Sequence, residues 1–479
     1  RQTCSRTRPG RRRTGAGPRT RPDPGPGAER ARPGDPDPMK RLATLLLAAT
    51  LLSGCASVRE SASRLWPFGG EGEAERKSPD DGRVSILTFD TAVTPDPAAA
   101  AQPFLLPPAT AMASWPAPGG PVSNAPGHIK ADGPLAQAWR RGAGEGSARD
   151  RALTASPIVA DGRIYVLDAG LTVRAFDAST GAPAWSQNLR PRREGRGRDR
   201  DPRALPGGIA FADGRVFAST GWGEVVALDA ATGAEAWRAR NPSPIHTAPV
   251  AANGRVFVVS TDSEILAFDA ATGATQWTFQ AIAEPARMLS SPSPAVQGDV
   301  VVAPFASGEL VALLAANGRR LWTDALTRTS RVTSLSAIND IAGRPGPPAL
   351  TPTARVTPLP ANHDLAGGPP IAGGVVFAAS QSGVLAAVDL RTGQRLWART
   401  IGSIQTPMVA GDHVFVVTTD SQVVCLERAT GVVRWVRELR RFEDVEDRKG
   451  RVVWSGPVLA SNRLVLASSR GDVAVLNPA

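Results

Sequence analysis

Short runs of alternating apolar and polar residues, separated by turn residues, recur along the chain. The clearest copy is residues 253–277, NGRVFVVSTDSEILAFDAATGATQW, in which an Asn-Gly turn precedes two alternating runs and a third leads to Trp277. A period of two is typical of half-buried β-strands. Asn-Gly supplies the positive φ angles of a two-residue hairpin, and Gly273 avoids the steric clash of a left-handed residue. The pattern therefore predicts three short strands joined by tight turns.

This unit is used at least six times, with a constant step of four residues to a Gly and eight to a Trp. The copies are Asp177/Gly181/Trp185, Asp229/Gly233/Trp237, Asp269/Gly273/Trp277 and Asp389/Gly393/Trp397, with degenerate copies at Leu314/Gly318/Trp322 and Glu427/Gly431/Trp435. Trp237 and Trp277 lie 40 residues apart and Trp397 and Trp435 lie 38 apart, the length of four strands and their turns, while the linkers between other copies vary in length. We therefore predict an all-β fold, a β-propeller of four-stranded blades of the PQQ-like or WD40-like type.

Seven hairpin turns indicate seven blade starts. They are Asp161-Gly162, Asp213-Gly214, Asn253-Gly254, Gly298-Asp299, Gly373-Gly374, Gly411-Asp412 and Ser461-Asn462. The seventh unit stops at Ala479, before its Thr-Gly and Trp, whereas Trp139 has no repeat unit before it. We expect Trp139 to lie on the outer strand of a blade completed by the far end of the chain. Residues 136–479 are thus expected to form a propeller of eight blades, cut within the seventh.

Residues 1–38 are mostly Arg, Pro and Gly and have no starting Met. Such a segment buries too little apolar surface to offset its ordering entropy, so we interpret it as a disordered, untranslated leader, with a basic nucleic-acid arm as the alternative. It holds ten Arg against four acidic residues, and Lys40 and Arg41 follow, so eight of the eleven net positive charges precede Leu42. The charge is therefore no argument for a nucleic-acid partner.

Residues 39–54, MKRLATLLLAATLLSG, have the positive pair, short apolar run and small residues of an export signal. The apolar run is too short for a stable membrane anchor. With Cys55, its end resembles the lipobox of bacterial lipoproteins, in which the Cys is acylated. Since Ala56 rather than Asp follows, we expect a lipid anchor in the outer membrane and a chain that faces the periplasm. An ordinary cleaved signal with a chance Cys is the alternative.

The segments between the signal and the repeats are expected to lack regular structure. Residues 55–82 are polar and are interpreted as a membrane tether, and residues 83–135 are rich in Pro and Ala and are expected to be extended but irregular. Two charged insertions, residues 191–206 and 440–450, are expected to be solvated loops, with a contact loop as the alternative for the second. Cys425 stands where other blades carry Ala and is expected to be a small buried residue.

Several motifs together resemble the BamB family, the propeller lipoproteins of the machinery that inserts β-barrels into the outer membrane. They are the lipobox, the Asp-Thr-Gly and Trp repeats, SGELVAL, IQTPMVAGDHVFVVTTDSQVVCLERATG and RFEDVEDRKGRVVWSGPVLA, in an alphaproteobacterial form that covers residues 39–479. The resemblance implies a non-enzymatic scaffold without a cofactor. It also implies binding to the insertase subunit BamA, to other subunits of the machinery, and to unfolded outer-membrane clients.

The resemblance further implies partner-binding residues on two neighbouring inter-blade loops. The first loop corresponds to Arg287, Met288 and Leu289, one cation and two apolar side chains. The second corresponds to Asp340 or to Asp364, because NDIAGRP is echoed 24 residues later by HDLAGGP, and both candidates stay open. A mixed charged and apolar patch suits a protein partner. Ordinary connecting loops are the alternative.

A PQQ-dependent quinoprotein dehydrogenase is the alternative function, since such enzymes share these repeats. The adjacent Cys pair typical of that family is absent, and the acidic residues lie mostly in repeat turns rather than in a calcium-binding cluster. His128, His246, His363 and His413 share no metal-ligand spacing and are expected to be isolated surface or loop residues. These features favour a protein without catalytic residues or a metal.

Overall fold

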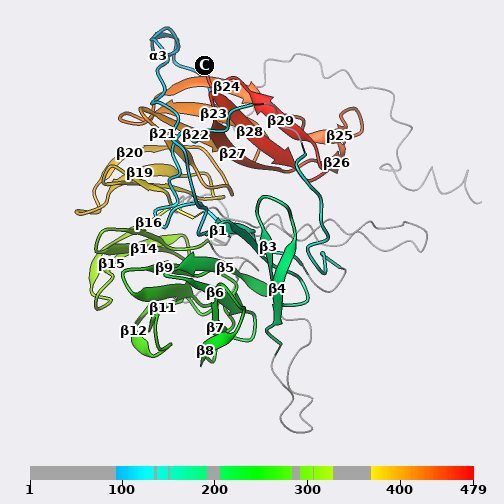
Figure 1. The fold of residues 1–479 in the computed structure, drawn as a ribbon. Coiled ribbons are helices and arrows are strands. Elements are labelled where there is room, and N and C mark those ends of the chain that lie inside the picture. Colours follow the sequence, from blue (N-terminus) through cyan, green and yellow to red (C-terminus); the bar gives the residue numbers. More distant parts are fainter. Residues whose placement is uncertain are drawn as a thin grey trace, which may run out of the picture. The chain divides into compact units, whose positions relative to one another are not determined.

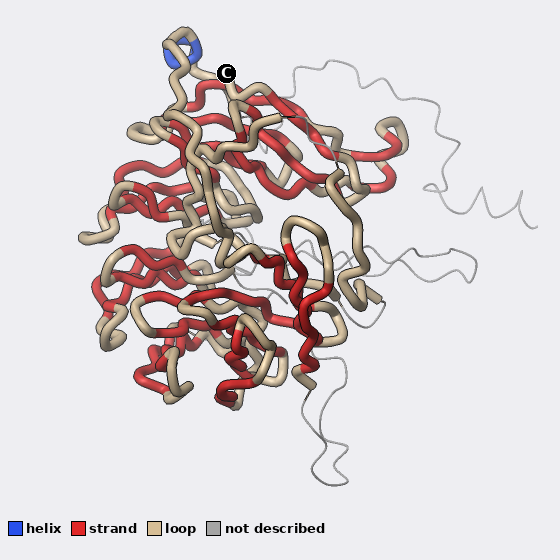
Figure 2. Tube along the Cα trace, viewed as in Figure 1, coloured by secondary structure: helices blue, strands red, loops and turns tan. Residues whose placement is uncertain are grey.

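The computed structural model describes residues 93–133, 137–148, 152–190, 205–282, 292–305, 307–326 and 368–479. All of them belong to one compact unit, Thr88–Ala479. Apart from one short helix, α3 (Pro97–Ala100), the regular structure of these residues is β. Figures 1 and 2 show the strands as a succession of small sheets.

Seven of the sheets in the described residues are blades, numbered here in chain order. Blades 1 to 3 consist of β1 (Ile158–Ala160), β2 (Arg163–Leu167), β3 (Thr172–Asp177), β4 (Pro183–Asn188); β5 (Pro206–Ala212), β6 (Arg215–Thr220), β7 (Glu224–Asp229), β8 (Glu235–Arg240); and β9 (Val250–Ala252), β10 (Arg255–Val259), β11 (Glu264–Asp269), β12 (Thr275–Gln280). Blades 4 to 6 consist of β13 (Ala295–Gln297), β14 (Val300–Pro304), β15 (Glu309–Leu314), β16 (Arg320–Ala325); β17 (Ile371–Ala372), β18 (Val375–Ala379), β19 (Leu385–Asp389), β20 (Arg395–Arg399); and β21 (Met408–Ala410), β22 (His413–Val417), β23 (Gln422–Glu427), β24 (Val433–Glu438). Blade 7 consists of β27 (Trp454–Ala460), β28 (Arg463–Ser468) and β29 (Val473–Leu476), and a separate hairpin, β25 (Phe442–Asp444) and β26 (Lys449–Arg451), precedes it.

The seven predicted hairpin turns all connect the first two strands of a blade. At Asn253 and Gly254 both φ angles are positive, 54° and 69°, as a type I′ turn requires. The turn fixes the register of β9 and β10, in which Ala252 pairs with Arg255. The predicted propeller fold of four-stranded blades is confirmed, and the three strands predicted within residues 253–277 are β10, β11 and β12.

The repeated Trp and Gly form the contact between consecutive blades. Trp237, on the outer strand of blade 2, donates from Nε1 to the Ala270 carbonyl in blade 3 at 3.0 Å. Its ring lies against Gly273, where φ is +76° and a Cβ atom would stand 2.6 Å from the indole. Trp185, Trp277, Trp322 and Trp397 repeat both contacts. The eight-residue step thus joins one blade to the next.

Trp139 takes the same place against blade 1. Its Nε1 donates to the Ala178 carbonyl at 3.0 Å, and its ring lies against Gly181. Residues 137–147, however, form no strand, so the expectation that Trp139 lies on an outer strand is wrong. The expectation of eight blades stays a prediction, because the described residues form seven blades, the seventh with three strands, besides the two-stranded sheet of β25 and β26.

The core consists of separate apolar clusters between neighbouring blades. Cys425 is fully buried in one of them and pairs in register with Trp435, as Ala227 pairs with Trp237 and Ala267 with Trp277. The prediction of a small buried residue is confirmed, and burial raises the pKa of its thiol to about 12.

The expectations for the segments outside the blades are confirmed for some segments and stay predictions for others. The insertion at residues 440–450 is exposed, as expected, but most of it forms the hairpin of β25 and β26. Residues 93–132 are largely irregular, as expected. The leader, the signal segment, Cys55 and the tether lie outside the described residues, as does most of the insertion at residues 191–206.

Candidate functional site

Residues 93–132, called the belt here, begin beside β24 of blade 6 and continue along the first strands of other blades (Figure 1, blue to cyan). At blade 1 the belt pairs like an added strand, because Trp115 N–H donates to the Val159 carbonyl and Val159 N–H donates to the Trp115 carbonyl, at 2.6 and 2.9 Å. Val159 is the second-last residue of β1, and its peptide groups face away from β2. The belt therefore extends the free edge of the blade.

The same position bonds to the belt in four further blades. The bonds run from Phe211 N–H to Pro116 O (2.8 Å), from Val296 N–H to Val122 O (2.8 Å), from Ile371 N–H to Ser123 O (2.8 Å) and from Ile129 N–H to Leu459 O (3.0 Å). Phe211, Val296, Ile371 and Leu459 are each the second-last residue of a first strand. An unpaired buried peptide group costs free energy, so these bonds stabilise the inner edge of the propeller.

Blade 6 holds the start of the belt through side chains and through one backbone hydrogen bond, from Asp96 N–H to the Val433 carbonyl at 2.8 Å. The ring of Phe104 stacks on His413 with centroids 4.1 Å apart, and His413 Nε2 lies 3.0 Å from the Leu105 carbonyl. The buried guanidinium of Arg434 lies 5.4 Å from the centre of the Phe104 ring and donates to the Gln102 carbonyl. Burial, aided by the nearby charge of Arg434, lowers the pKa of His413 from its ordinary value. A neutral His413 that donates from Nε2 fits this contact.

His128 joins the belt to itself and to blade 7. Its Nδ1 lies 2.7 Å from the Pro107 carbonyl, and its Nε2 accepts from Asn462 N–H at 2.9 Å. With Nε2 as the acceptor, Nδ1 is the ring nitrogen that faces the Pro107 carbonyl as a donor. His128 lies in an irregular segment, as expected, but it is only 4% exposed and has partners, so the expectation that it is isolated is wrong. His413 lies on β22 and is only 2% exposed, so the expectation of an isolated surface or loop residue is wrong for it.

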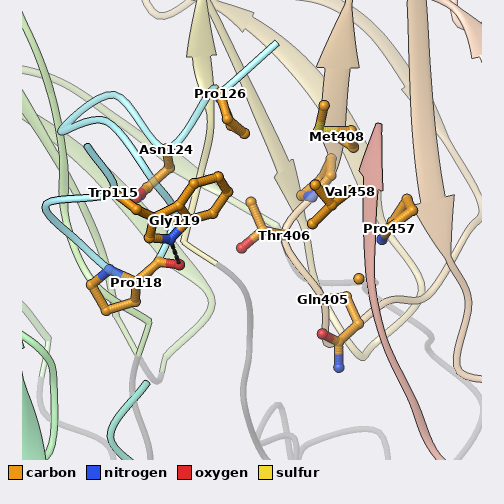
Figure 3. Close-up of a pocket in the computed structure, with 12 residues that line it drawn as sticks. Trp115, Pro118, Gly119, Asn124, Pro126, Gln405, Thr406, Met408, Pro457 and Val458 are labelled. Atoms are coloured by element: carbon orange, nitrogen blue, oxygen red, sulfur yellow. Dashed lines mark hydrogen bonds between the residues drawn. The ribbon is translucent and has the colours of Figure 1, made fainter. Parts of the chain in front are cut away.

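A pocket of about 210 Å³ lies where the belt passes blades 6 and 7 (Figure 3). The belt contributes Trp115 and Pro126, and β27 contributes Val458. Thr406 comes from the stretch that leads into β21, and Met408 is the first residue of that strand. Figure 3 shows the Trp115 ring turned toward these side chains, with its Nε1 bonded to the Pro118 carbonyl at 3.1 Å. The pocket is therefore mainly apolar, with backbone groups and a few polar side chains around it.

The site residues predicted from the sequence lie outside the described residues. Arg287, Met288 and Leu289 fall on the connection between β12 and β13, and Asp340 and Asp364 fall on the connection between β16 and β17. Their assignment to a partner-binding surface stays a prediction. The belt and its pocket were not predicted as a site, because a Pro-rich sequence gives no signal for the strands that it contacts.

The acidic residues of the repeats are used within their own turns. Asp177 accepts hydrogen bonds from the N–H and hydroxyl groups of Ser179 and Thr180, which lower the pKa of its carboxyl to about 2. Similar bonds lower the pKa of Asp229, Asp269 and Asp389. Among the described residues, no three His, Cys, Asp or Glu side chains are grouped to hold a metal, and no helix is long and apolar enough to cross a membrane.

Comparisons with known proteins agree with this architecture. The family model described as "Outer membrane protein assembly factor BamB" matches residues 135–200, 171–346 and 351–437. The BamB of Salmonella typhimurium is 31% identical over 321 residues, which cover 67% of this chain and 73% of that protein. The BamB of Xanthomonas campestris is 35% identical over 298 residues, 62% of this chain and 66% of that protein.

Among solved structures, BamB from Moraxella catarrhalis is similar with a TM-score of 0.53 and 20% identity, over 68% of this chain and 85% of that chain. At this identity the likeness supports the propeller fold alone. The family match and the sequence identities go further, since together they extend over most of the blades. The chain belongs to the BamB family of outer membrane protein assembly factors.

Proposed function

We propose that the protein is a non-enzymatic scaffold of the machinery that assembles proteins into the outer membrane. Membership of the BamB family is the observation that carries this proposal. The fold suits the role, because blades joined by repeated Trp and Gly contacts present their connections on a rigid frame. The dehydrogenase alternative receives no support from the carboxylates of the repeats, which are used in turns.

In this proposal the protein is anchored by lipid at Cys55 and binds BamA through the connections around blade 4. Arg287 supplies a cation, Met288 and Leu289 supply apolar contacts, and either Asp340 or Asp364 supplies an anion. A small number of such side chains dominates the affinity of a typical protein interface. Unfolded outer-membrane proteins are the proposed clients.

Affinity purification from membranes tests the partner. The full-length protein should recover BamA, and Arg287→Glu combined with Leu289→Ala should remove most of that recovery. Arg391→Glu, the same charge change on the exposed turn between β19 and β20, is the matched control and should leave recovery unchanged. A folded double variant that still recovers BamA at the wild-type level would place the interface elsewhere.

Two further variants address the finer assignments. Asp340→Lys and Asp364→Lys are compared separately, and only the residue that contacts BamA should weaken recovery. Cys55→Ala should abolish acylation and, with it, attachment of the protein to the outer membrane. Retention of this variant in the outer membrane would contradict the lipid anchor.

A further inference from the structure

The belt shows how the inner edge of a blade binds an extended chain. In blades 1, 2, 4 and 5 the N–H of the second-last residue of the first strand donates to a belt carbonyl, and in blade 7 the carbonyl of that residue accepts from the belt. The contact uses backbone atoms, so it does not depend on the identity of the bound residue. Extended peptides bind exposed sheet edges in this way generally.

Two positions of this register have no such bond. They are Ala251 in β9 and Val409 in β21, and among the described residues the belt makes no backbone hydrogen bond to either. Val409 pairs with Val414 as Val159 pairs with Ile164, so its N–H faces away from β22 as that of Val159 faces away from β2. Blade 6 therefore has the donor that the belt uses elsewhere.

Side chains of the belt pack beside both positions. Val122 packs against the cluster that contains Val250 in blade 3, and Phe104 and Leu106 pack against the cluster that contains Met408 and Ala410 in blade 6. In blade 6 the pocket opens beside Met408, the residue next to Val409, and Trp115 forms its far wall (Figure 3). A volume of about 210 Å³ is below that of common cofactor pockets, roughly 300 Å³ and more, and suits one large apolar side chain.

We propose that this pocket and the inner edge of β21 bind an extended polypeptide that carries an aromatic or large aliphatic residue. A peptide carbonyl accepts from Val409 N–H, as Pro116 O accepts from Phe211 N–H, and the apolar side chain of the peptide fills the pocket against Trp115. The inference rests on the proposed function, in which unfolded clients meet this protein. The inference adds to that function where on the propeller a client binds and which atoms it uses.

The test measures binding of a fluorescein-labelled peptide of alternating Phe and Thr to the purified full-length protein by anisotropy. Val409→Pro removes the edge donor without removing a bond to β22, a position at which strands tolerate Pro. Ala251→Pro removes the matching donor in blade 3 and is the control. Thr406→Trp fills the pocket and leaves the backbone intact, so the test stands even if Val409→Pro does not fold.

The wild type and Ala251→Pro should bind the peptide with affinities within about twofold, whereas Val409→Pro and Thr406→Trp should bind at least about tenfold more weakly. A peptide with Ser in place of Phe should not bind to the wild type. The inference is overturned if the wild type does not bind the Phe peptide, if folded Thr406→Trp binds it as well as the wild type, or if both Pro variants lose binding equally.

Recovery of BamA from membranes separates this inference from the proposed function. Thr406→Trp should still recover BamA, because the pocket is not part of the proposed BamA contact. A wild-type protein that recovers BamA but does not bind the peptide overturns only the pocket. A protein that binds the peptide but recovers no BamA keeps the pocket and overturns the scaffold proposal.

Discussion

Substitution of Gly273 by Ala should destabilise the protein through the contact between blades 2 and 3. Gly273 has a φ angle of +76°, and a Cβ atom there would lie 2.6 Å from Cε3 of Trp237. The ring cannot move away freely, because its Nε1 donates to the Ala270 carbonyl at 3.0 Å. The new methyl group therefore adds a steric clash to the strain of a left-handed Ala.

The expected magnitude has two parts. A left-handed conformation costs a non-Gly residue about 1–2 kcal/mol. Insertion of a methyl group into a well-packed contact costs typically about 1–3 kcal/mol more. The free energy of unfolding should therefore fall by about 2–5 kcal/mol, of which only the second part reports the contact with Trp237.

Gly254 in the same blade separates the two parts. It has a φ angle of +69°, but no atom lies within 4 Å of the position of an added Cβ. Gly254→Ala should therefore show the backbone strain alone, and urea unfolding followed by circular dichroism should place Gly273→Ala below it by about 1–3 kcal/mol at an unchanged slope. Equal destabilisation by the two substitutions would refute the claim that the Trp and Gly contact holds consecutive blades together.

Three further outcomes can be measured on the same protein. Burial lowers the pKa of His413, so on acidification below about pH 6.5 the unfolded state takes up a proton before the folded state does. The free energy of unfolding in urea should therefore fall by up to about 1.4 kcal/mol per pH unit. His413→Gln should lose this pH dependence, and an unchanged pH dependence in the variant would contradict the assignment. NMR should find the carboxyl of Asp177 half-protonated at about pH 2. The contribution of its turn to the stability of the folded state should be present above about pH 3.8 and be lost as the pH falls toward 2. A titration midpoint near pH 3.8 would exclude the hydrogen bonds in this turn. Iodoacetamide at neutral pH should modify Cys425, identified by peptide mass, only after denaturation, because burial raises the pKa of its thiol to about 12; rapid modification of the folded protein would show that blade 6 opens.

The blades could be predicted because each is specified by residues close together in the chain. The turn at Asn253 and Gly254 and the step from Asp269 to Trp277 define strands whose partners follow within a few residues. What the repeat did not reveal was the partner of each Trp, since Trp237 contacts Gly273 of the next blade rather than the Gly of its own turn. The spacing of Asp, Gly and Trp predicted the strands of each blade, but the reason for that spacing is a contact between neighbouring blades.

The belt could be predicted only as an irregular segment. Its bonds to Val159, Phe211 and Val296 use backbone groups, which nearly every residue type supplies, so no pattern of side chains marks the contacts. The two buried histidines were misjudged for a related reason. His128 bonds to Asn462 and His413 bonds to Leu105, and neither partner lies near its His in the sequence.

The belt also changes how the blades depend on one another. In an array of repeats each unit contacts its neighbours, so unfolding can begin at one unit and spread. Here Trp115 bonds to blade 1 and Ile129 to blade 7, so one short segment joins the first and the last of the described blades. Separation of either blade must break belt contacts as well as those with its neighbour. The frame that carries blade 4, beside which the partner is proposed to bind, therefore depends for its rigidity on contacts along the inner edge of the propeller.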